Sequence, residues 1–249
     1  MRDVFVIVTA AGSGTRLGFD MPKALVDLDG KTIVQHAVEG VLQVPSIAGI
    51  VVTAPSGHEF EIAGYFESHP NIQVVTGGAT RQESVFHGLQ LLPEFAEKIG
   101  APLRPNTPVL IHDAARCLTP VSVFAEVIAC LRGGLPAVIP AVAVTDTQKM
   151  VASNPVIAGD GMQVDRVIGQ VDRAQLRAVQ TPQGFHWHTI WQAHDESKNL
   201  WKTGGATDDG ALVEAKGVPV HLSHGSGQSL KITKKLDVAI ARYLLQTER

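Results

Sequence analysis

Short apolar runs rich in β-branched residues alternate with helical patterns along most of the sequence, and this alternation restricts the possible fold more than any other feature. Such alternation favours a parallel sheet covered by helices on both faces. We therefore predict an α/β fold, a Rossmann-like three-layer αβα arrangement around a mostly parallel sheet. The expected strands are Val4–Thr9, Gly49–Thr53, Ile72–Val75, Val109–His112 and Ala137–Ala143, and the expected helices are Thr32–Leu42, Arg81–Leu92 and Val121–Leu131.

The pattern changes after Asp146. Residues Lys149–Val171 carry glycines, an Asn-Pro pair and short alternating runs, so we expect a β-arm over residues 146–173 that leaves the main sheet. Apolar residues on an arm without a core of its own need a partner surface. We expect one domain, 1–249, with this arm for dimerisation. The remaining expectations are a surface loop at Glu94–Pro108, helices at Trp187–Trp201, Asp209–Lys216 and Leu236–Leu245, and strands at Pro219–His224 and Ser229–Thr233.

Composition excludes several classes of protein. The 249 residues can bury a substantial core, and their 45% hydrophobic content fits a globular protein. The net charge is −3 and the basic residues are scattered, so we expect no nucleic-acid partner. Because no apolar run approaches the ~18 residues of a membrane helix and no signal peptide precedes the first strand, we expect a cytoplasmic protein without a membrane partner.

A small-residue loop follows the first expected strand. Residues Thr9–Gly18 read TAAGSGTRLG, and a Pro-Lys pair comes soon after. In α/β folds, ligands bind where strands end. Gly12 and Gly14 lack the side chains that would prevent the backbone from closing around phosphate oxygens, and Arg16 and Lys23 supply positive charge. This loop is predicted to hold a polyphosphate.

This loop has a simpler alternative interpretation. A glycine-rich turn between a strand and a helix would use the same residues. The glycine spacing is not G-x-G-x-x-G, and no G-K-[ST] follows, so neither a Rossmann dinucleotide site nor a Walker ATPase fits.

The motif HDAAR stands where the strand expected at Val109–His112 ends. Asp113 could orient a sugar hydroxyl or bind Mg²⁺, since hard cations prefer oxygen ligands, and Arg116 could bind a phosphate or hydroxyl. A local ion pair between the two is the alternative.

A second glycine motif, GGATRQESV, follows the strand expected at Ile72–Val75. Paired glycines would let a flat base lie against the backbone, and Ser84 offers a hydroxyl to a base edge. An ordinary glycine turn before a helix remains the alternative.

Taken together, the motifs are more specific than any one of them. The ordered set AAGSGTR, PK, GGATRQESV, HDAAR, DT, VDR, TPQ, TDD and LKIT resembles the cytidylyltransferases of the nucleotidyltransferase A-type fold, above all the family that acts on 2-C-methyl-D-erythritol 4-phosphate. The resemblance extends over nearly the whole chain. It implies transfer of CMP from CTP to methylerythritol 4-phosphate, with release of pyrophosphate, in the non-mevalonate isoprenoid pathway.

The resemblance also implies roles for individual residues. The cradle for CTP would comprise Ala10, Ala11, Gly12 and Gly14, with Gly78 and Ser84 at the cytosine. The catalytic charges would come from Arg16, Lys23 and Lys231. Mg²⁺ would bridge the phosphates, with Asp113 as a possible ligand. The acceptor would contact Asp113, Arg116 and Thr207, together with Thr147, Arg173 and Thr181, which match groups that the arm brings to the other subunit of a homodimer.

Two other functions remain open from the sequence. A ribitol 5-phosphate cytidylyltransferase would share the fold and most CTP-site motifs, because the polyol end of the pocket decides the acceptor. A catalytically silent nucleotide-sensing module would use the same pocket. Retention of Arg16, Lys23, Asp113 and Lys231 argues against the second, because a sensor would not need all of these charges.

Overall fold

The computed structural model describes residues 2–12, 14, 18, 21–197 and 208–247. An eight-stranded sheet forms its centre, with the strand order β12-β7-β13-β6-β1-β4-β5 and with β14 paired to β7. Strands β1, β4, β5 and β6 are parallel, whereas β13 is antiparallel to both of its neighbours. The strands of this sheet are β1 (Val4–Thr9), β4 (Ile47–Ala54), β5 (Ile72–Thr76), β6 (Pro108–Asp113), β7 (Ala137–Ala143), β12 (Arg177–Val179), β13 (Gln183–His186) and β14 (His221–His224).

Helices cover both faces of the sheet. Successive residues of a strand point to opposite faces, so the inner strand β1 contributes side chains to the core on each side. Val6 and Val8 of β1 belong to one buried cluster, and Phe5 and Ile7 to the other. The first cluster includes residues of α1 (Ile33–Leu42), α2 (Glu59–Gly64), α4 (Val121–Arg132) and α7 (Lys235–Thr247). The second includes residues of α3 (Arg81–Lys98), α5 (Trp187–Ser197) and α6 (Asp209–Glu214). The three-layer αβα prediction is confirmed.

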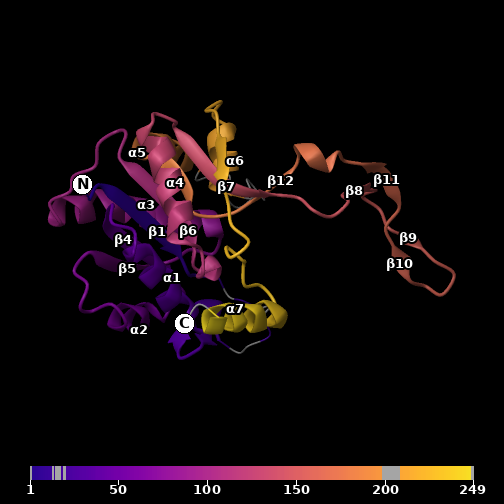
Figure 1. The fold of residues 1–249 in the computed structure, drawn as a ribbon, viewed down its shortest axis with the longest axis horizontal. Helices are drawn as coiled ribbons and strands as arrows, with labels where there is room; N and C mark the ends of the chain where they lie inside the picture. The colour runs from indigo at the N-terminus through magenta and orange to yellow at the C-terminus, as the bar shows by residue number, and fades with distance from the viewer. Residues whose placement is uncertain (1, 13, 15–17, 19–20, 198–207, 248–249) are drawn as a thin grey trace.

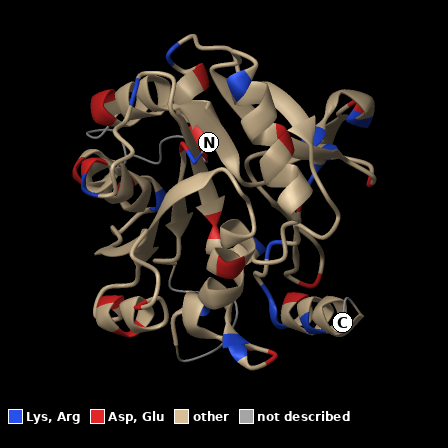
Figure 2. Cartoon of the chain, turned by 60° about the vertical axis from the view of Figure 1, so that its left-hand side comes forward, with Lys and Arg blue, Asp and Glu red and all other residues tan. Residues whose placement is uncertain are grey.

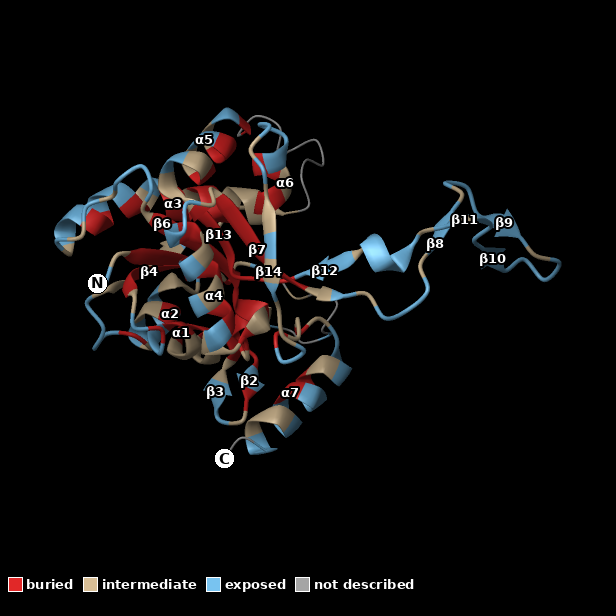
Figure 3. Ribbon diagram, turned by 45° about the horizontal axis from the view of Figure 1, so that its top comes forward, coloured by how far each residue is buried: buried red, intermediate tan, exposed pale blue. Residues whose placement is uncertain are grey.

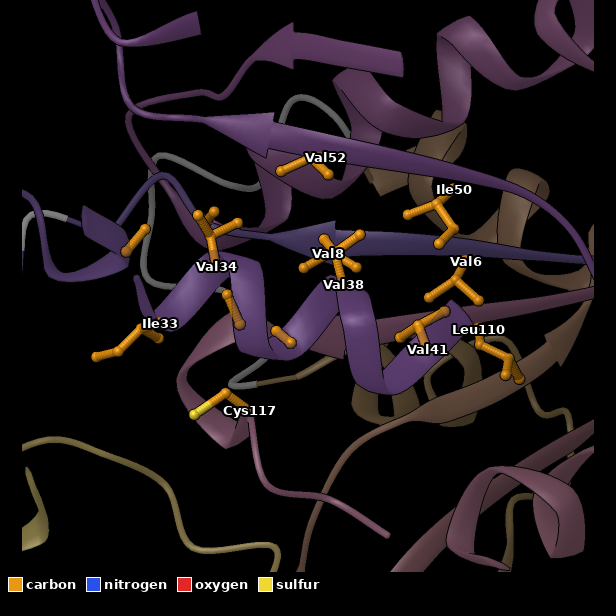
Figure 4. Packing of buried hydrophobic residues seen from close by; sticks show 14 of the residues in the cluster. Val6, Val8, Ile33, Val34, Val38, Val41, Ile50, Val52, Leu110 and Cys117 are labelled. Carbon is orange, nitrogen blue, oxygen red and sulfur yellow. The ribbon is translucent and has the colours of Figure 1, made fainter. Parts of the chain in front are cut away.

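Helix α1 illustrates this packing (Figure 4). Val34, Val38 and Val41 are fully buried and face the valines of β1 and β4. Burying each such side chain contributes roughly 1.5–3 kcal/mol. The helix begins at a capping box, in which Thr32 Oγ1 accepts the Gln35 N–H at 3.3 Å and Gln35 Oε1 accepts the Thr32 N–H at 2.8 Å. This face of the sheet is therefore held rigidly beneath the loops at its edge.

The arm leaves the sheet after β7 and returns in β12 (Figure 1). Within it, β8 (Lys149–Val151) pairs with β11 (Val167–Gln170), and β9 (Val156–Ile157) pairs with β10 (Gln163–Val164). A short helix, Arg173–Gln175, lies on the return path. The arm is exposed along its length (Figure 3), and its outward apolar side chains include Ile157 and Ile168. The expected β-arm is thus present as a segment that projects from the sheet.

Two expectations were wrong. The loop expected at Glu94–Pro108 is helical to Lys98, because Phe95 is buried edge-to-face against Phe5 and this burial outweighs the hydrogen bond lost at Pro93. The strand expected at Ser229–Thr233 is absent from the described chain. There, the Ile232 N–H donates to Ala115 O at 2.8 Å, so the segment bonds to the short helix Ala114–Arg116 and not to a strand.

The antiparallel strand β13 was not predicted, and neither were α2 and β12. The sequence of β13, QGFH, lacks the β-branched residues typical of strands. Gly184 is required there because a Cβ atom would lie 2.4 Å from Val127 Cγ1 of α4. Among the later elements, β14 begins at His221, α6 ends at Glu214, and residues 198–201 of the helix expected at Trp187–Trp201 lie outside the described residues.

Candidate active site

A cleft of about 1010 Å³ opens at the carboxyl ends of the parallel strands β1, β5 and β6. Three loops that follow these strands line it, as the topology of α/β sheets predicts. Its lining includes residues 9–12 and 21–24 after β1, 76–81 after β5 and 113–115 after β6, together with Lys231. The cleft therefore brings together all three motifs that were singled out in the sequence.

The loop after β1 forms one wall of the cleft. Ala10, Ala11 and Gly12 line it, and the Ala10 N–H donates to Thr53 O at 2.9 Å. Gly14 has a φ of +69°, and a Cβ atom there would lie 2.6 Å from Lys23 Cβ. The glycine thus allows Lys23, at the start of the short helix Lys23–Leu25, to pack against the loop while lining the cleft. Arg16 lies outside the described residues.

The loop after β5 forms another wall of the cleft. A Cβ atom on Gly77 would lie 2.3 Å from Ala11 Cβ, so the loops after β1 and β5 can approach this closely only because residue 77 has no side chain. Ser84 is buried, and its hydroxyl accepts the Gly78 N–H at 3.0 Å and donates to Thr80 O at 2.9 Å. Its proton is therefore directed at the loop itself, which fixes the shape of this wall.

Asp113 is the buried charge at the end of β6. Its Oδ2 accepts from Lys231 Nζ at 2.6 Å, and its Oδ1 accepts from Arg81 Nε at 3.1 Å. Burial alone would raise the pKa of this carboxyl, but the charges of Arg81 and Lys231 hold it well below its usual range. Asp113 is therefore ionised at neutral pH. The local ion pair with Arg116 that was left open is not the arrangement observed.

Arg116 instead holds backbone carbonyls. It donates to Ser229 O at 2.6 Å and to Val179 O at 3.2 Å, and it is not among the described residues that line the cleft. Burial lowers the pKa of its guanidinium. The first of these bonds fixes the segment that carries Lys231, so Arg116 supports the position of that lysine.

Thr181 and His112 lie beneath Asp113. The Asp113 N–H donates to Thr181 Oγ1 at 3.1 Å, and Thr181 Oγ1 lies 3.1 Å from His112 Nδ1. Burial lowers the pKa of His112 to about 4, so this imidazole is neutral at pH 7. Both residues therefore position the backbone at the end of β6.

The arm residues lie apart from this cleft within one chain. Thr147 precedes β8, and Arg173 opens the short helix on the return path, where its Nη1 donates to Thr145 O at 2.5 Å. Neither residue lines the cleft in the described part of the chain. Thr207 lies outside the described residues.

Arg81 had no predicted role, but it lines the cleft and joins two carboxylates. Its Nη1 donates to Asp209 Oδ2 at 2.6 Å, and Asp209 is fully buried. Its position in the sequence could have indicated a site role, because Arg81 begins the helix that follows β5, at the same edge of the sheet as Asp113. The pairing with Asp209 had no such signal, because it depends on how a distant segment returns to the site.

Other kinds of site find no support within the described residues. Residues 2–12, 14, 18, 21–197 and 208–247 contain no group of three or more His, Cys, Asp or Glu side chains placed to hold a metal ion. No helix in this part of the chain has the length and apolar character needed to cross a membrane. Basic and acidic residues are interspersed around the fold (Figure 2).

A mostly parallel α/β sheet, with a glycine-lined and cation-bearing cleft at the carboxyl ends of its parallel strands, defines a nucleotide-binding enzyme of the nucleotidyltransferase class. The family model for 2-C-methyl-D-erythritol 4-phosphate cytidylyltransferase (IspD) matches residues 4–247. The chain belongs to this family.

Individual relatives agree with this assignment. The chain is 39% identical to the 2-C-methyl-D-erythritol 4-phosphate cytidylyltransferase of Rhodococcus opacus over 243 residues, which cover 98% of this chain and 95% of the relative. It is 37% identical to the enzyme of that name from Streptomyces avermitilis, with 98% and 92% covered. The crystal structure of the Francisella tularensis 2-C-methyl-D-erythritol 4-phosphate cytidylyltransferase superimposes with a TM-score of 0.77 at 26% identity, covering 97% of this chain and 99% of the other.

Proposed function

We propose that this chain transfers CMP from CTP to 2-C-methyl-D-erythritol 4-phosphate, giving 4-diphosphocytidyl-2-C-methyl-D-erythritol and pyrophosphate in the non-mevalonate isoprenoid pathway. Membership of the family supports the choice of substrates. The observation that carries the proposal is the cleft itself, in which the loop after β1 and Lys23 lie together with the Asp113–Lys231 pair.

The reaction needs positioning and charge more than proton transfer. A phosphate monoester has its second pKa near ~6 and is largely dianionic at pH 7. One of its oxygens attacks the α-phosphorus of CTP, and the bond from that phosphorus to the oxygen of the leaving pyrophosphate breaks. No general base is required, because the attacking oxygen carries no proton. The protein stabilises the charge that develops on the phosphoryl oxygens and on the leaving group.

The nucleotide would occupy the two glycine loops. The backbone of Ala10, Ala11, Gly12 and Gly14 would hold the triphosphate, and Gly78 would approach the cytosine. Ser84 would maintain the shape of the second loop, since its hydroxyl joins Gly78 to Thr80. Cationic stabilisation would come from Arg16, Lys23 and Lys231.

The acceptor would lie at the Asp113 end of the cleft. Asp113 would orient its hydroxyls, with Thr207 nearby, while Arg116 and Thr181 would hold the surrounding backbone. Thr147 and Arg173 would reach the acceptor from a second subunit, since within one chain they lie on the projecting arm. Residues 1–249 would thus form one domain, with 146–173 as its dimerisation arm. The exposed apolar side chains of the arm support this interpretation, because burial against a partner would remove them from water.

The residues present fit a cation that arrives with the nucleotide. Asp113 is the carboxylate among the described residues that line the cleft, and both of its oxygens already accept hydrogen bonds. Mg²⁺ commonly keeps several waters and is bound by one or two carboxylates together with substrate phosphates. Bound in this way, Mg²⁺ would neutralise phosphate charge, with Asp113 as its possible protein ligand.

Release of pyrophosphate tests the proposal directly. The purified protein is incubated with CTP and Mg²⁺ and with either methylerythritol 4-phosphate or ribitol 5-phosphate. We expect pyrophosphate and a cytidine diphosphate product with the first acceptor at a kcat/KM at least tenfold that of the second. Preference for ribitol 5-phosphate would overturn the assigned acceptor, and absence of pyrophosphate with both would favour a silent nucleotide-binding module.

A further inference from the structure

Arg81 joins two carboxylates that belong to different parts of the fold. It is the first residue of α3, and its guanidinium donates from Nε to Asp113 Oδ1 at 3.1 Å and from Nη1 to Asp209 Oδ2 at 2.6 Å. Asp113 ends β6, and Asp209 begins α6. The planar fork of arginine presents several donors in fixed directions, so one side chain can hold both acceptors at once.

Asp209 is a rigid anchor for this fork. Its side chain is fully buried, and its second oxygen, Oδ1, lies 2.9 Å from His194 Nε2 of α5. Its backbone N–H donates to Gln183 Oε1 at 3.1 Å, which ties the start of α6 to β13. Burial alone would raise the pKa of the Asp209 carboxyl, but the Arg81 charge lowers it, so this carboxylate is ionised. Because a buried charge needs a partner, Asp209 holds Arg81 in place.

Asp113 depends on Arg81 for its orientation. Lys231 holds Oδ2, whereas Oδ1 accepts from Arg81 Nε at 3.1 Å and from Thr9 Oγ1 at 3.3 Å. Without Arg81, Oδ1 would keep, from the residues that the structure describes, only the longer bond donated by the neutral Thr9 hydroxyl. The carboxylate could then rotate about its bond to Cβ, which would change the direction of the acceptor groups that it presents to the cleft.

We infer that Arg81 is a positioning residue for the acceptor half of the site. It orients the Asp113 carboxylate, and through Asp209 it fixes the start of α6, two positions after Thr207 in the sequence. The two glycine loops are held by other bonds: the Ala10 N–H donates to Thr53 O at 2.9 Å, and the Gly78 N–H donates to Ser84 Oγ at 3.0 Å. Arg81 therefore controls binding and use of the polyol phosphate more than binding of CTP. This inference rests on the proposed function only for the identity of the acceptor.

Three variants test it. Arg81→Met removes both ion pairs, and Arg81→Lys keeps a charge that reaches one carboxylate but not both. The matched control is Arg132→Met, which removes the ion pair between Arg132 and Asp3 on the surface. For each protein, calorimetry gives the Kd of CTP, and pyrophosphate release at saturating CTP gives KM for whichever polyol phosphate the wild type accepts.

We expect Arg81→Met to raise the acceptor KM at least tenfold while the Kd of CTP changes less than threefold. Arg81→Lys should lie between this variant and the wild type, and Arg132→Met should match the wild type. An unchanged acceptor KM in Arg81→Met would overturn the inference. Equal losses for CTP and the acceptor would also overturn it, since they would show a general structural role.

A second readout needs no acceptor and therefore separates this inference from the proposed function. The crystal structures of the wild type and of Arg81→Met, both without substrate, give the orientation of the Asp113 carboxylate. We expect this carboxylate to turn about its bond to Cβ in Arg81→Met, because the charged donor to Oδ1 is gone while Lys231 still holds Oδ2. An unchanged orientation of Asp113 would overturn the inference even if the wild type used neither polyol phosphate.

If Arg81→Met fails to fold, Asp209→Asn provides the same tests. The amide keeps the size of the side chain and can still accept from Arg81, but it lacks the charge that anchors the guanidinium. We expect a smaller rise of the acceptor KM in the same direction, with an unchanged Kd for CTP. A wild-type acceptor KM in Asp209→Asn would overturn the link between α6 and the cleft.

Discussion

Lys231 Nζ lies 2.6 Å from Asp113 Oδ2, although the two residues are 118 positions apart in the sequence. Both residues line the cleft, where the Asp113 side chain is 9% exposed and that of Lys231 is 41% exposed. Lys231 can therefore keep this contact or turn toward a phosphate. Its position also depends on Arg116, which holds Ser229 two residues before it.

Replacing Lys231 with methionine should lower kcat by roughly 10²–10³, the usual cost of removing one group that stabilises charge in the transition state. Steady-state pyrophosphate release measures this effect. The control is Lys216→Met, which removes a surface pair with Glu196 and should leave kcat unchanged. A kcat within threefold of the wild type in Lys231→Met would rule out a catalytic role for this lysine.

Gly77→Ala should push apart the loops after β1 and β5, which approach each other closely at Ala11 and Gly77. The new methyl group would lie 2.3 Å from Ala11 Cβ, 3.0 Å from Ser84 Oγ and 3.1 Å from Ala54 O. Overpacking of this kind costs about 1–3 kcal/mol, and we expect CTP to bind at least tenfold more weakly. Calorimetry with CTP and urea unfolding measure the two effects.

The control for this change is Gly64→Ala, where an added Cβ meets no atom within 4 Å. It should leave both CTP binding and stability near the wild-type values. Adding Ala11→Gly to Gly77→Ala should recover part of the lost affinity, because it removes the nearest clash. Wild-type CTP affinity in Gly77→Ala would show that the loops can move apart without consequence.

Local chemistry made the first part of the site predictable. The apolar run of β1 and the glycines after it predicted the loop that lines the cleft, because a buried strand that ends in small residues is typical of a ligand-binding loop. Asp113 was found in the same way, at the end of β6. These residues lie together because the carboxyl ends of parallel strands share one edge of the sheet.

Contacts between distant segments were not predictable in this way. Arg81 and Asp209 are 128 positions apart, and no local pattern in either segment specifies their pairing. Strand β13 escaped notice because Gly184 is there to admit Val127, a requirement that only the packed helix α4 imposes. The strand expected around Lys231 is missing for a related reason. The buried residues of this segment, Ser229 and Ile232, are three positions apart, and the Ile232 N–H bonds to the short helix Ala114–Arg116. A sheet partner is lacking among the described residues.

Mixing two inactive variants should test whether the arm serves a second subunit. Lys23→Ala removes a cation from the cleft, and Arg173→Ala removes one from the arm, so each homodimer should turn over at least a hundredfold more slowly. In a mixed dimer, one cleft would have both groups intact. We expect co-expressed, separately tagged subunits to regain between roughly a quarter and half of the wild-type activity per dimer, because the sites act independently. The higher value applies to purified mixed dimers, with one intact cleft of two, and the lower to random pairing of the subunits.

The control for mixing is a dimer in which one subunit carries both substitutions and its partner carries neither. Each of its clefts would lack one group if the arm crosses between subunits, so this dimer should stay inactive. Activity in that dimer, together with inactivity of the complementing mixture, would show that Thr147 and Arg173 serve their own chain.

His112 should make stability depend on pH between neutrality and about pH 4. Burial lowers its pKa to about 4 in the folded protein, whereas an unfolded histidine titrates near ~6.5. Above pH 6.5 both states are neutral and the full stability is present. As the pH falls toward about 4, the unfolded chain binds a proton that the folded chain does not, so stability is lost. The loss amounts to about 3 kcal/mol in all, at ~1.4 kcal/mol per pKa unit, and about 2 kcal/mol of it falls between pH 7.5 and 5.

Urea unfolding at pH 7.5 and pH 5 measures this loss in the wild type and in His112→Asn. The asparagine amide can approach Thr181 Oγ1 as the imidazole Nδ1 does, at 3.1 Å in the wild type, but it does not titrate. We expect the variant to be less stable at pH 7.5, because it leaves space beside Phe124, and to lose about 2 kcal/mol less than the wild type on acidification. His188→Asn, at an exposed position, should behave like the wild type. Equal losses in the wild type and His112→Asn would mean that His112 is protonated at pH 5 while the chain is still folded, and that the imidazole beneath Asp113 is open to solvent protons.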